Sequence, residues 1–449
     1  MTIADKQSRS TVGYLNGESR SKELYERALE VMPGGNSRHT LVMDPYPIYA
    51  TSGKGCRVTD VEGDERIDFI NNYTALIRGH ADAVVTEAVR AVVGRGTAFS
   101  MPTESDIRLA ELLVDRVPGM EQIRFANSGS EGVLLTIRAA RAATGRSKIA
   151  KFEGCYHGVY DYAQASDSSR PHNWGDRRNP RTTLEPSMAR SLFDEVVTLP
   201  WNDIEACRTL IGNQASNLAA VVFDPLPAAL GLIAPDQGFV EFLREITRQH
   251  GILLIADEVL SFRVSYQGAC AAHGIEPDLV SLGKIIGGGF PVGAVMGKRS
   301  VMDVFDHRAG EKVHHGGTYN GNPVTMVAGY ETMRQMTREA YDRLESLGDR
   351  LRAGVAETVG RHGIAHQVTG RGSLFGVLFT EAPIRDFRGL LEASAVEPGQ
   401  AKVVAEMLSR GILLGQRGVL GCLSTPMGTD EIDAFVVALD ESLGAARQR

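Results

Sequence analysis

Residues 278–294 read Asp-Leu-Val-Ser-Leu-Gly-Lys-Ile-Ile-Gly-Gly-Gly-Phe-Pro-Val-Gly-Ala and contain one lysine, Lys284. Apolar residues precede this lysine, and the glycines Gly287 to Gly289 follow it. An ammonium group in apolar surroundings tends to lose its proton, and a neutral amine can attack a carbonyl carbon. Glycines let backbone and ligand approach closely. The stretch alone is also compatible with an exposed lysine in a flexible loop, since lysines are mostly exposed.

Strands and helices alternate around this stretch. The sequence predicts short apolar strands at 123–126, 148–152, 196–199, 219–223, 252–256, 279–282 and 292–296. Helices are expected between several of them, for example from Phe239 to His250, with Gly251 behind it as a stop signal. Such alternation predicts an α/β domain with a largely parallel sheet.

The length of 449 residues suggests two or three domains. We predict a large domain over 76–335 and a smaller domain built from 1–75 and 336–449. Residues 46–70 are predicted to form short antiparallel strands with a turn at 60–64. The segment 164–190 is polar with almost no aliphatic residues, which indicates a lid loop or a disordered segment.

The overall composition excludes several classes. The formal net charge of −7 argues against a nucleic-acid or anionic-membrane partner. The five cysteines are scattered and form no CxxC pair, so we expect no disulfide framework and no zinc or other metal site. No apolar run approaches the roughly 18–20 residues that span a bilayer. The first 20 residues are polar and lack the apolar core of a secretory signal, so we expect a cytoplasmic protein.

Four further motifs could carry chemistry. Asn127-Ser128-Gly129-Ser130 lies between a predicted strand and helix, where it could bind a phosphate or simply cap the helix. Asp257 follows an apolar strand, as site residues of α/β sheets do, although an exposed turn is the alternative. Tyr156 could stack on a planar ligand or belong to the core, and Thr318 lies in a glycine-rich loop suited to an anion.

Other enzyme classes lack their motifs here. The sequence has no GxxxxGK[ST] phosphate loop, no HExxH, and no GxSxG after a strand. The three glycines after Lys284 lack the spacing of a dinucleotide-binding loop.

Taken in order, these motifs resemble those of the class III aminotransferases, which are pyridoxal 5'-phosphate enzymes of fold type I. The resemblance extends from about residue 22 to 443. It implies a large domain with a mostly parallel seven-stranded sheet and a smaller α+β domain from both termini. It also implies an obligate homodimer with shared active sites.

The resemblance implies a role for each motif. Lys284 would hold the cofactor as a Schiff base and shuttle a proton, and Asp257 would pair with the pyridinium nitrogen. Gly129 and Ser130 would bind the phosphate, with Ser128 as a weaker candidate. The other implied cofactor contacts are Tyr156 on one ring face, Val259 on the other, and Thr318 reaching the phosphate of the neighbouring subunit.

Two subgroups of the family fit best. Residues 151–158 and 282–289 look like the motifs of glutamate-1-semialdehyde 2,1-aminomutase. Residues 32–38 and 416–418 resemble the β-amino-acid (β-phenylalanine) aminotransferase, where Arg38 and Arg417 match two arginines that bind substrate carboxylates.

The stretch 223–229 departs from both subgroups. Asp224 stands where the aminotransferases usually have glutamate, and Ala229 stands where the aminomutases have asparagine. Four arginines of 164–190 could be a solvated charge run or could steer an acidic substrate: Arg170, Arg177, Arg178 and Arg181. We expect transamination of an amino acid or amine, first of all a β-amino acid, with a 2-oxo acid as acceptor. The alternative is intramolecular amino transfer of the aminomutase type.

Overall fold

A computed structural model describes residues 19–310, 312–396, 399–415 and 418–448. The chain forms two compact units. Unit 1 comprises the described residues of Met1–Ala83, Arg343–Pro383 and Ala393–Arg449, and unit 2 comprises Val84–Asp342 and Ile384–Glu392.

Unit 2 is built on a seven-stranded sheet with the strand order β4-β10-β9-β8-β7-β5-β6. Neighbouring strands from β9 to β6 run parallel, whereas β10 pairs antiparallel with both β9 and β4. The predicted mostly parallel sheet of seven strands is therefore confirmed. The strands are β4 Gln122–Ala126, β5 Lys148–Phe152, β6 Val196–Leu199, β7 Leu218–Phe223, β8 Leu253–Asp257, β9 Leu279–Gly283 and β10 Gly293–Gly297.

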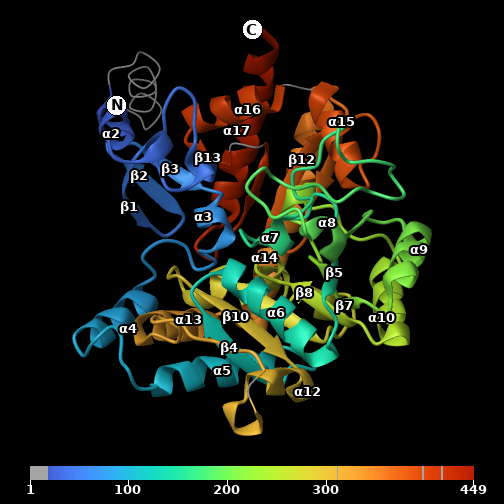
Figure 1. The fold of residues 1–449 in the computed structure, drawn as a ribbon. Coiled ribbons are helices and arrows are strands. Elements are labelled where there is room, and N and C mark those ends of the chain that lie inside the picture. The colour runs from blue at the N-terminus through green and yellow to red at the C-terminus, as the bar shows by residue number, and fades with distance from the viewer. Residues whose placement is uncertain (1–18, 311, 397–398, 416–417, 449) are drawn as a thin grey trace. The chain divides into compact units, whose positions relative to one another are not determined.

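Helices cover this sheet, and α6 lies across β10, β9 and β7 (Figure 1). Gly132 allows α6 to lie close to β10, because a Cβ at this position would lie only 2.9 Å from Ala294 O. The α-helices of unit 2 are α4 Ala83–Val93, α5 Glu104–Arg116, α6 Gly129–Thr144, α7 Asp161–Gln164, α8 Leu192–Glu195, α9 Ile204–Gln214, α10 Phe239–His250, α11 Ala269–Ala272, α12 Arg299–Met302 and α13 Pro323–Gln335. Its 3-10 turns are η3 Ala228–Leu230, η4 Ser261–Val264, η5 Lys284–Gly287, η6 Asp303–Phe305 and η7 His307–Ala309.

Unit 1 draws on both terminal parts of the chain, as the resemblance implies. Strand β13 pairs parallel with β3, so Ile67 and Ile412, 345 positions apart, share one sheet of order β1-β2-β3-β13. The predicted turn at 60–64 is confirmed, because β2 and β3 pair antiparallel on either side of it. A second sheet has the order β11-β12-β14. The strands are β1 Ala50–Lys54, β2 Arg57–Asp60, β3 Glu65–Asp68, β11 His366–Thr369, β12 Leu374–Phe379, β13 Ile412–Leu413 and β14 Leu420–Cys422.

The helices of unit 1 pack on these sheets. They are α2 Arg20–Leu29, η1 Pro33–Gly35, η2 His39–Leu41, α3 Asn71–Thr74, α16 Gly399–Ser409 and α17 Thr429–Gln448. Two more, α14 Arg338–Arg361 and α15 Phe387–Val396, run across the limit between the units. None of the described helices combines the length and apolar character needed to cross a membrane.

Helices α5 and α6 differ in how their beginnings are capped. The spacing of Thr103 and Asp106 in the sequence is typical of a capping box, but the Thr103 hydroxyl lies 2.8 Å from Ser105 Oγ and 3.3 Å from Asp106 Oδ1 and caps no backbone group. The prediction of a capping box at Thr103 is wrong, because the hydroxyl bonds to these two side chains and not to a backbone N–H group. A capping box forms instead at Ser128, the first hydroxyl of the phosphate-loop candidate.

Candidate active site

Three candidate residues lie at the carboxyl ends of neighbouring strands. Asp224 directly follows β7, Asp257 ends β8, and Lys284 directly follows β9. Strand pairing places Phe223 beside Ala256 and Asp257 beside Ser281, so the three ends lie at the same edge of the sheet. Ligands of α/β proteins bind at such edges.

Asp257 is bound by a histidine from another strand end. His157 follows β5, and its Nδ1 lies 2.7 Å from Asp257 Oδ2. Burial lowers the pKa of His157 more than the Asp257 carboxylate raises it, so the imidazole is neutral at neutral pH. An ionised carboxylate can only accept, so the Nδ1–H donates to Asp257. His157 lies within residues 151–158, which resemble an aminomutase motif, but the sequence points only to its neighbour Tyr156 as a cofactor contact.

The second oxygen of Asp257 is also engaged, since Val259 N donates to Oδ1 over 3.1 Å. Asp257 is 4% exposed and His157 is 2% exposed. The carboxylate is therefore oriented by two donors in a site with little water. Within the described part of the chain, the other ring nitrogen of His157, Nε2, is buried without a hydrogen-bond partner.

Lys284 has an unusual backbone conformation. Its φ is +47°, in the left-handed region that a side chain disfavours. This conformation costs about 1–3 kcal/mol and is found most often at functional sites. Gly283 before it is extended and Gly288 behind it has φ +59°, so the strand turns sharply at the lysine. The side chain is partly buried.

Asp224 adds a second carboxyl beside Asp257. Burial raises the pKa of Asp224 well above its usual value, and the neighbouring Asp257 raises it further. A backbone hydrogen bond from Leu226 and the charge of Lys284 oppose this shift without cancelling it. The Asp224 carboxyl is therefore held in its neutral form more readily than an ordinary aspartate.

The phosphate-loop candidate begins the 16-residue helix α6. Ser128 Oγ accepts from Glu131 N at 3.2 Å, while Glu131 Oε2 accepts from Asn127 N and Ser128 N. The capping interpretation of Ser128 is therefore confirmed. Ser130 Oγ faces the loop after β5, where it accepts from Val159 N at 3.1 Å.

Glycines at this point let neighbouring segments pack more closely than side chains would allow. A Cβ on Gly129 would lie 2.7 Å from Val259 Cγ1, and a Cβ on Gly158 would lie 2.4 Å from Ser130 Oγ. Tyr156 lies near the same loop and is 54% exposed. Its ring therefore has a face available to a ligand.

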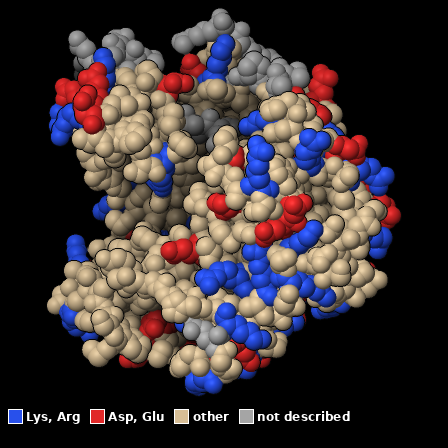
Figure 2. Space-filling view, viewed as in Figure 1, with Lys and Arg blue, Asp and Glu red and all other residues tan. Residues whose placement is uncertain are grey.

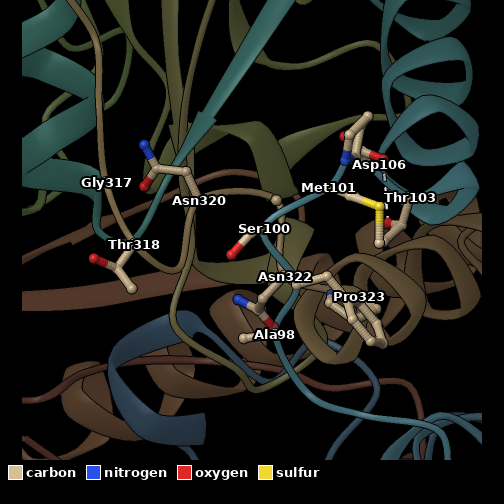
Figure 3. Close-up of a pocket in the computed structure, with 13 residues that line it drawn as sticks. Ala98, Ser100, Met101, Thr103, Asp106, Gly317, Thr318, Asn320, Asn322 and Pro323 are labelled. Atoms are coloured by element: carbon tan, nitrogen blue, oxygen red, sulfur yellow. Dashed lines mark hydrogen bonds between the residues drawn. The ribbon is translucent and has the colours of Figure 1, made fainter.

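Thr318 lies in an exposed loop that borders a hollow of about 300 Å³ (Figure 3). The opposite wall of the hollow comes from residues 98–103, which precede α5. Asn320 connects this loop to the beginning of α6, because Asn127 Nδ2 donates to Asn320 Oδ1 over 2.7 Å.

The two arginine candidates have different positions. Arg38 belongs to unit 1, is exposed, and donates from Nη1 to Asn72 Oδ1 over 3.0 Å. Arg417 lies outside the described residues.

The polar segment 164–190 carries surface and buried interactions. Arg177 pairs with Asp386 and Glu392, and Arg178 pairs with Asp203, all in unit 2. Figure 2 shows that further Lys and Arg side chains gather on the face of unit 2 around α6. The buried part includes Thr182, whose hydroxyl donates to Val196 O at 2.7 Å.

A buried ion pair anchors this segment. Arg388 Nε donates to Glu153 Oε2 over 2.8 Å, and both side chains are 5% exposed. The same guanidinium donates to the carbonyl oxygens of Trp174, Gly175 and Asp176. We did not predict Arg388 as a site-supporting residue, because 235 positions separate it from Glu153.

A family model described as aminotransferase class-III matches residues 41–436. The chain belongs to the class III aminotransferases. One curated relative is a glutamate-1-semialdehyde 2,1-aminomutase from Methanothermobacter thermautotrophicus, with 38% identity over 95% of this chain and 100% of that protein.

Solved structures resemble this class III chain over nearly its whole length. An omega-transaminase from Sphaerobacter thermophilus has 48% identity and a TM-score of 0.94, over 97% of this chain and 99% of that chain. A transaminase with PLP bound has 41% identity and a TM-score of 0.88, over 95% and 97%. A β-phenylalanine aminotransferase from Variovorax paradoxus has 31% identity and a TM-score of 0.85, over 99% and 98%.

The cofactor of this class III aminotransferase is pyridoxal phosphate, and the residues present fit it. The edge of the sheet offers a carboxylate for a ring nitrogen, an amine for an aldehyde, and the beginning of a long helix for a phosphate. A Cβ on Gly129 would meet Val259 and a Cβ on Gly158 would meet Ser130, so these glycines let the phosphate-loop candidate pack closely against its neighbours. Groups of three or more side chains suited to a metal ion are absent from the described residues.

Proposed function

We propose that this aminotransferase takes the amino group of a β-amino acid and passes it to a 2-oxo acid, with Lys284 and Asp257 as its catalytic residues. The observation that carries the proposal is the pairing of buried Asp257 with neutral His157, one strand away from Lys284. A carboxylate oriented in this way suits a protonated ring nitrogen.

Bound pyridoxal phosphate supplies an aldehyde that carries the amino group and a ring that delocalises the electron pair left at the donor carbon. Lys284 Nζ would hold the aldehyde carbon of the cofactor covalently at rest. Once the donor amine has replaced it at that carbon, the freed lysine amine could take the proton from the amino-bearing carbon of the donor and deliver it to the former aldehyde carbon. Asp257 keeps the ring nitrogen protonated, and His157 keeps Asp257 in place. The low exposure of both side chains limits screening by water.

The remaining contacts hold and orient the cofactor. Gly129 and Ser130 receive the phosphate at the beginning of α6, with Ser128 supporting them as the helix cap. Tyr156 covers one face of the ring and Val259 the other. The packing of Val259 against Gly129 and Gly283 supports its proposed place.

The proposal for the substrate rests on two arginines. Arg38 would receive the carboxylate of the amino donor, and Arg417 the α-carboxylate of the oxo acid, since a guanidinium binds a carboxylate through two hydrogen bonds. The similarity to a β-phenylalanine aminotransferase supports this choice. We also propose that segment 164–190 acts as a lid over the substrate.

We further propose a cytoplasmic homodimer in which Thr318 completes the partner's phosphate site. Phe99 and Met101 line the hollow beside Thr318 and are exposed, Tyr319 follows Thr318 and is also exposed, and a second copy of the chain would cover these side chains. Five buried thiols without disulfides support a reducing compartment. The predicted domains, 1–75 with 336–449 and 76–335, remain part of the proposal.

A donor panel tests the proposed function. β- and α-amino acids and amines are offered with pyruvate or 2-oxoglutarate, and the new amine is measured. We expect a β-amino acid to be the best donor. Isomerisation of an amino substrate without any oxo acid would favour aminomutase activity. The similarity to a 38% identical aminomutase supports this alternative. Arg417→Ala should weaken the half-reaction with the 2-oxo acid more than the half-reaction with the amino donor, and equal losses in both would contradict the role of Arg417.

A further inference from the structure

The short helix α3, Asn71–Thr74, is left-handed. Its four residues have φ values of +48°, +49°, +54° and +74°, and none is a glycine. Asparagine tolerates this region, whereas Tyr73 and the β-branched Thr74 are true outliers there. Strained backbone of this kind persists only where the surroundings enforce it, and it is most frequent at functional sites.

Hydrogen bonds to buried residues of unit 1 fix the turn. Asp68 Oδ1 accepts from the backbone N–H groups of Ile70 and Asn71, each over 2.8 Å. Asp68 Oδ2 lies 2.8 Å from His80 Nε2. Asn71 Nδ2 donates to Cys422 O over 3.0 Å, and Asn71 is 0% exposed. The conformation of the turn is therefore fixed by the core of unit 1.

Side chains of the turn bind the loop that carries Arg38 through hydrogen bonds. Arg38 Nη1 donates to Asn72 Oδ1 over 3.0 Å, and the hydroxyl of Tyr73 donates to Thr40 O. The backbone N–H of Arg38 donates to Asn36 Oδ1 over 2.9 Å. Arg38 and Asn72 are 34 positions apart in the sequence, and loop and turn are connected at Arg38 and at Thr40.

The hydrogen bond to Asn72 leaves most of the guanidinium available. Among the described residues, Asn72 is the one hydrogen-bond partner of the Arg38 side chain, through Nη1. The remaining N–H groups on Nε and Nη2 form the edge that binds a carboxylate through two parallel bonds. A neutral amide fixes the guanidinium without neutralising it, so the full charge stays available for a ligand.

We propose that Asn72, presented by the left-handed turn, is a specificity-determining positioning residue that orients Arg38 toward the carboxylate of the amino donor. This inference rests on the proposed function of Arg38. Asn72 touches Arg38 and acts through it, so its effect is limited to donors that carry a carboxylate.

Asn72→Gly tests the proposal most cleanly, because glycine keeps the left-handed conformation and removes only the amide. KM and kcat are measured in the holoenzyme for the best carboxylate donor of the panel and for the matching amine without a carboxylate. We expect KM for the carboxylate donor to rise about tenfold, as for the loss of a hydrogen bond to a charged group. Its kcat and both constants for the amine should stay within about twofold of wild type.

Three further variants make the result interpretable. Ala81→Gly changes another left-handed residue of unit 1 and should alter neither donor, since φ is +49° there and Arg38 is not involved. Asn72→Asp keeps an acceptor and the turn but neutralises Arg38, so KM for the carboxylate donor should rise at least as much. Arg38→Gln should raise KM for the carboxylate donor more than Asn72→Gly does.

The outcomes separate the two claims. If Arg38→Gln leaves KM unchanged, Arg38 does not bind the donor carboxylate, and the proposed function of Arg38 fails together with the inference. If Arg38→Gln raises KM and Asn72→Gly does not, the inference alone is overturned. Equal losses for carboxylate and amine donors in Asn72→Gly would show a general structural role and would also overturn it.

Discussion

His157 Nδ1 and Asp257 Oδ2 lie 2.7 Å apart between two buried side chains that are 100 positions apart in the sequence. Burial keeps the imidazole neutral, so its N–H orients the carboxylate without cancelling its charge. Asp257 can then pair with a cationic ring nitrogen. The relationship makes His157 a positioning residue that acts through Asp257.

Replacing His157 should reduce catalysis more than cofactor binding. A hydrogen bond to a charged group contributes about 1.5–3 kcal/mol, so we expect kcat of His157→Phe to fall about tenfold to a hundredfold. His157→Asn retains a donor and should recover part of the loss. His172→Phe, at an exposed position of segment 164–190, is the control and should resemble wild type. Full activity in His157→Phe would contradict the positioning role.

Gly129→Ala should weaken cofactor binding. The new Cβ would lie 2.7 Å from Val259 Cγ1, and such overpacking costs about 1–3 kcal/mol. The dissociation constant of pyridoxal phosphate, measured by titrating the apoenzyme, is expected to rise about tenfold. Gly212→Ala is the matched control, because a Cβ at Gly212 meets nothing within 4 Å. Equal affinities in the two variants would refute the proposed place of Val259.

Arg388→Met should destabilise the protein by about 3–5 kcal/mol, because it leaves Glu153 buried without its partner. Burial already raises the pKa of Glu153, although Arg388 lowers it, so the uncompensated charge would be costly. Urea unfolding measures the effect. Arg385→Met breaks an exposed pair with Asp236 and should cost at most about 1 kcal/mol. Similar losses in the two variants would contradict the anchoring role of Arg388.

Glu258 should make stability depend on pH. Burial raises its pKa to about 7, and two backbone hydrogen bonds from Ala269 and Cys270 only partly oppose this. Between its ordinary pKa and 7, the folded state binds more protons than the unfolded state, so this contribution is lost as the pH rises through about 7. Glu258→Gln cannot titrate, so its melting temperature relative to wild type should be higher at pH 8 than at pH 5. A difference independent of pH would count against the shift.

Much of the fold was predictable because its signals are local. Apolar runs predicted strands β5 and β6 with their observed limits, and Gly251 predicted the end of α10, where its φ is +61°. The order of the phosphate loop, Asp257 and Lys284 along the chain implied the family. Each follows a predicted strand, and strand ends of a parallel sheet meet at one edge, where ligands bind.

The interactions that the sequence did not predict join distant positions. Neither the His157–Asp257 pair nor the Arg388–Glu153 pair follows from a local sequence pattern. Their partners lie 100 and 235 positions apart, and only the three-dimensional arrangement of the strands and helices brings them together. The left-handed turn at Asn71–Thr74 has no glycine to signal it, and the buried Asp68 enforces it from outside the turn. At Ser128 both interpretations were reasonable, because capping and anion binding use the same residue types.

The attachment site of the cofactor tests the central claim most directly. The holoenzyme is treated with borohydride, which makes the lysine–cofactor linkage permanent, then digested and analysed by mass spectrometry. We predict a phosphopyridoxyl group on the peptide that contains Lys284, and its absence in Lys284→Ala together with loss of transamination. A group on the buried Lys151 or on another lysine, or full activity in Lys284→Ala, would contradict the account.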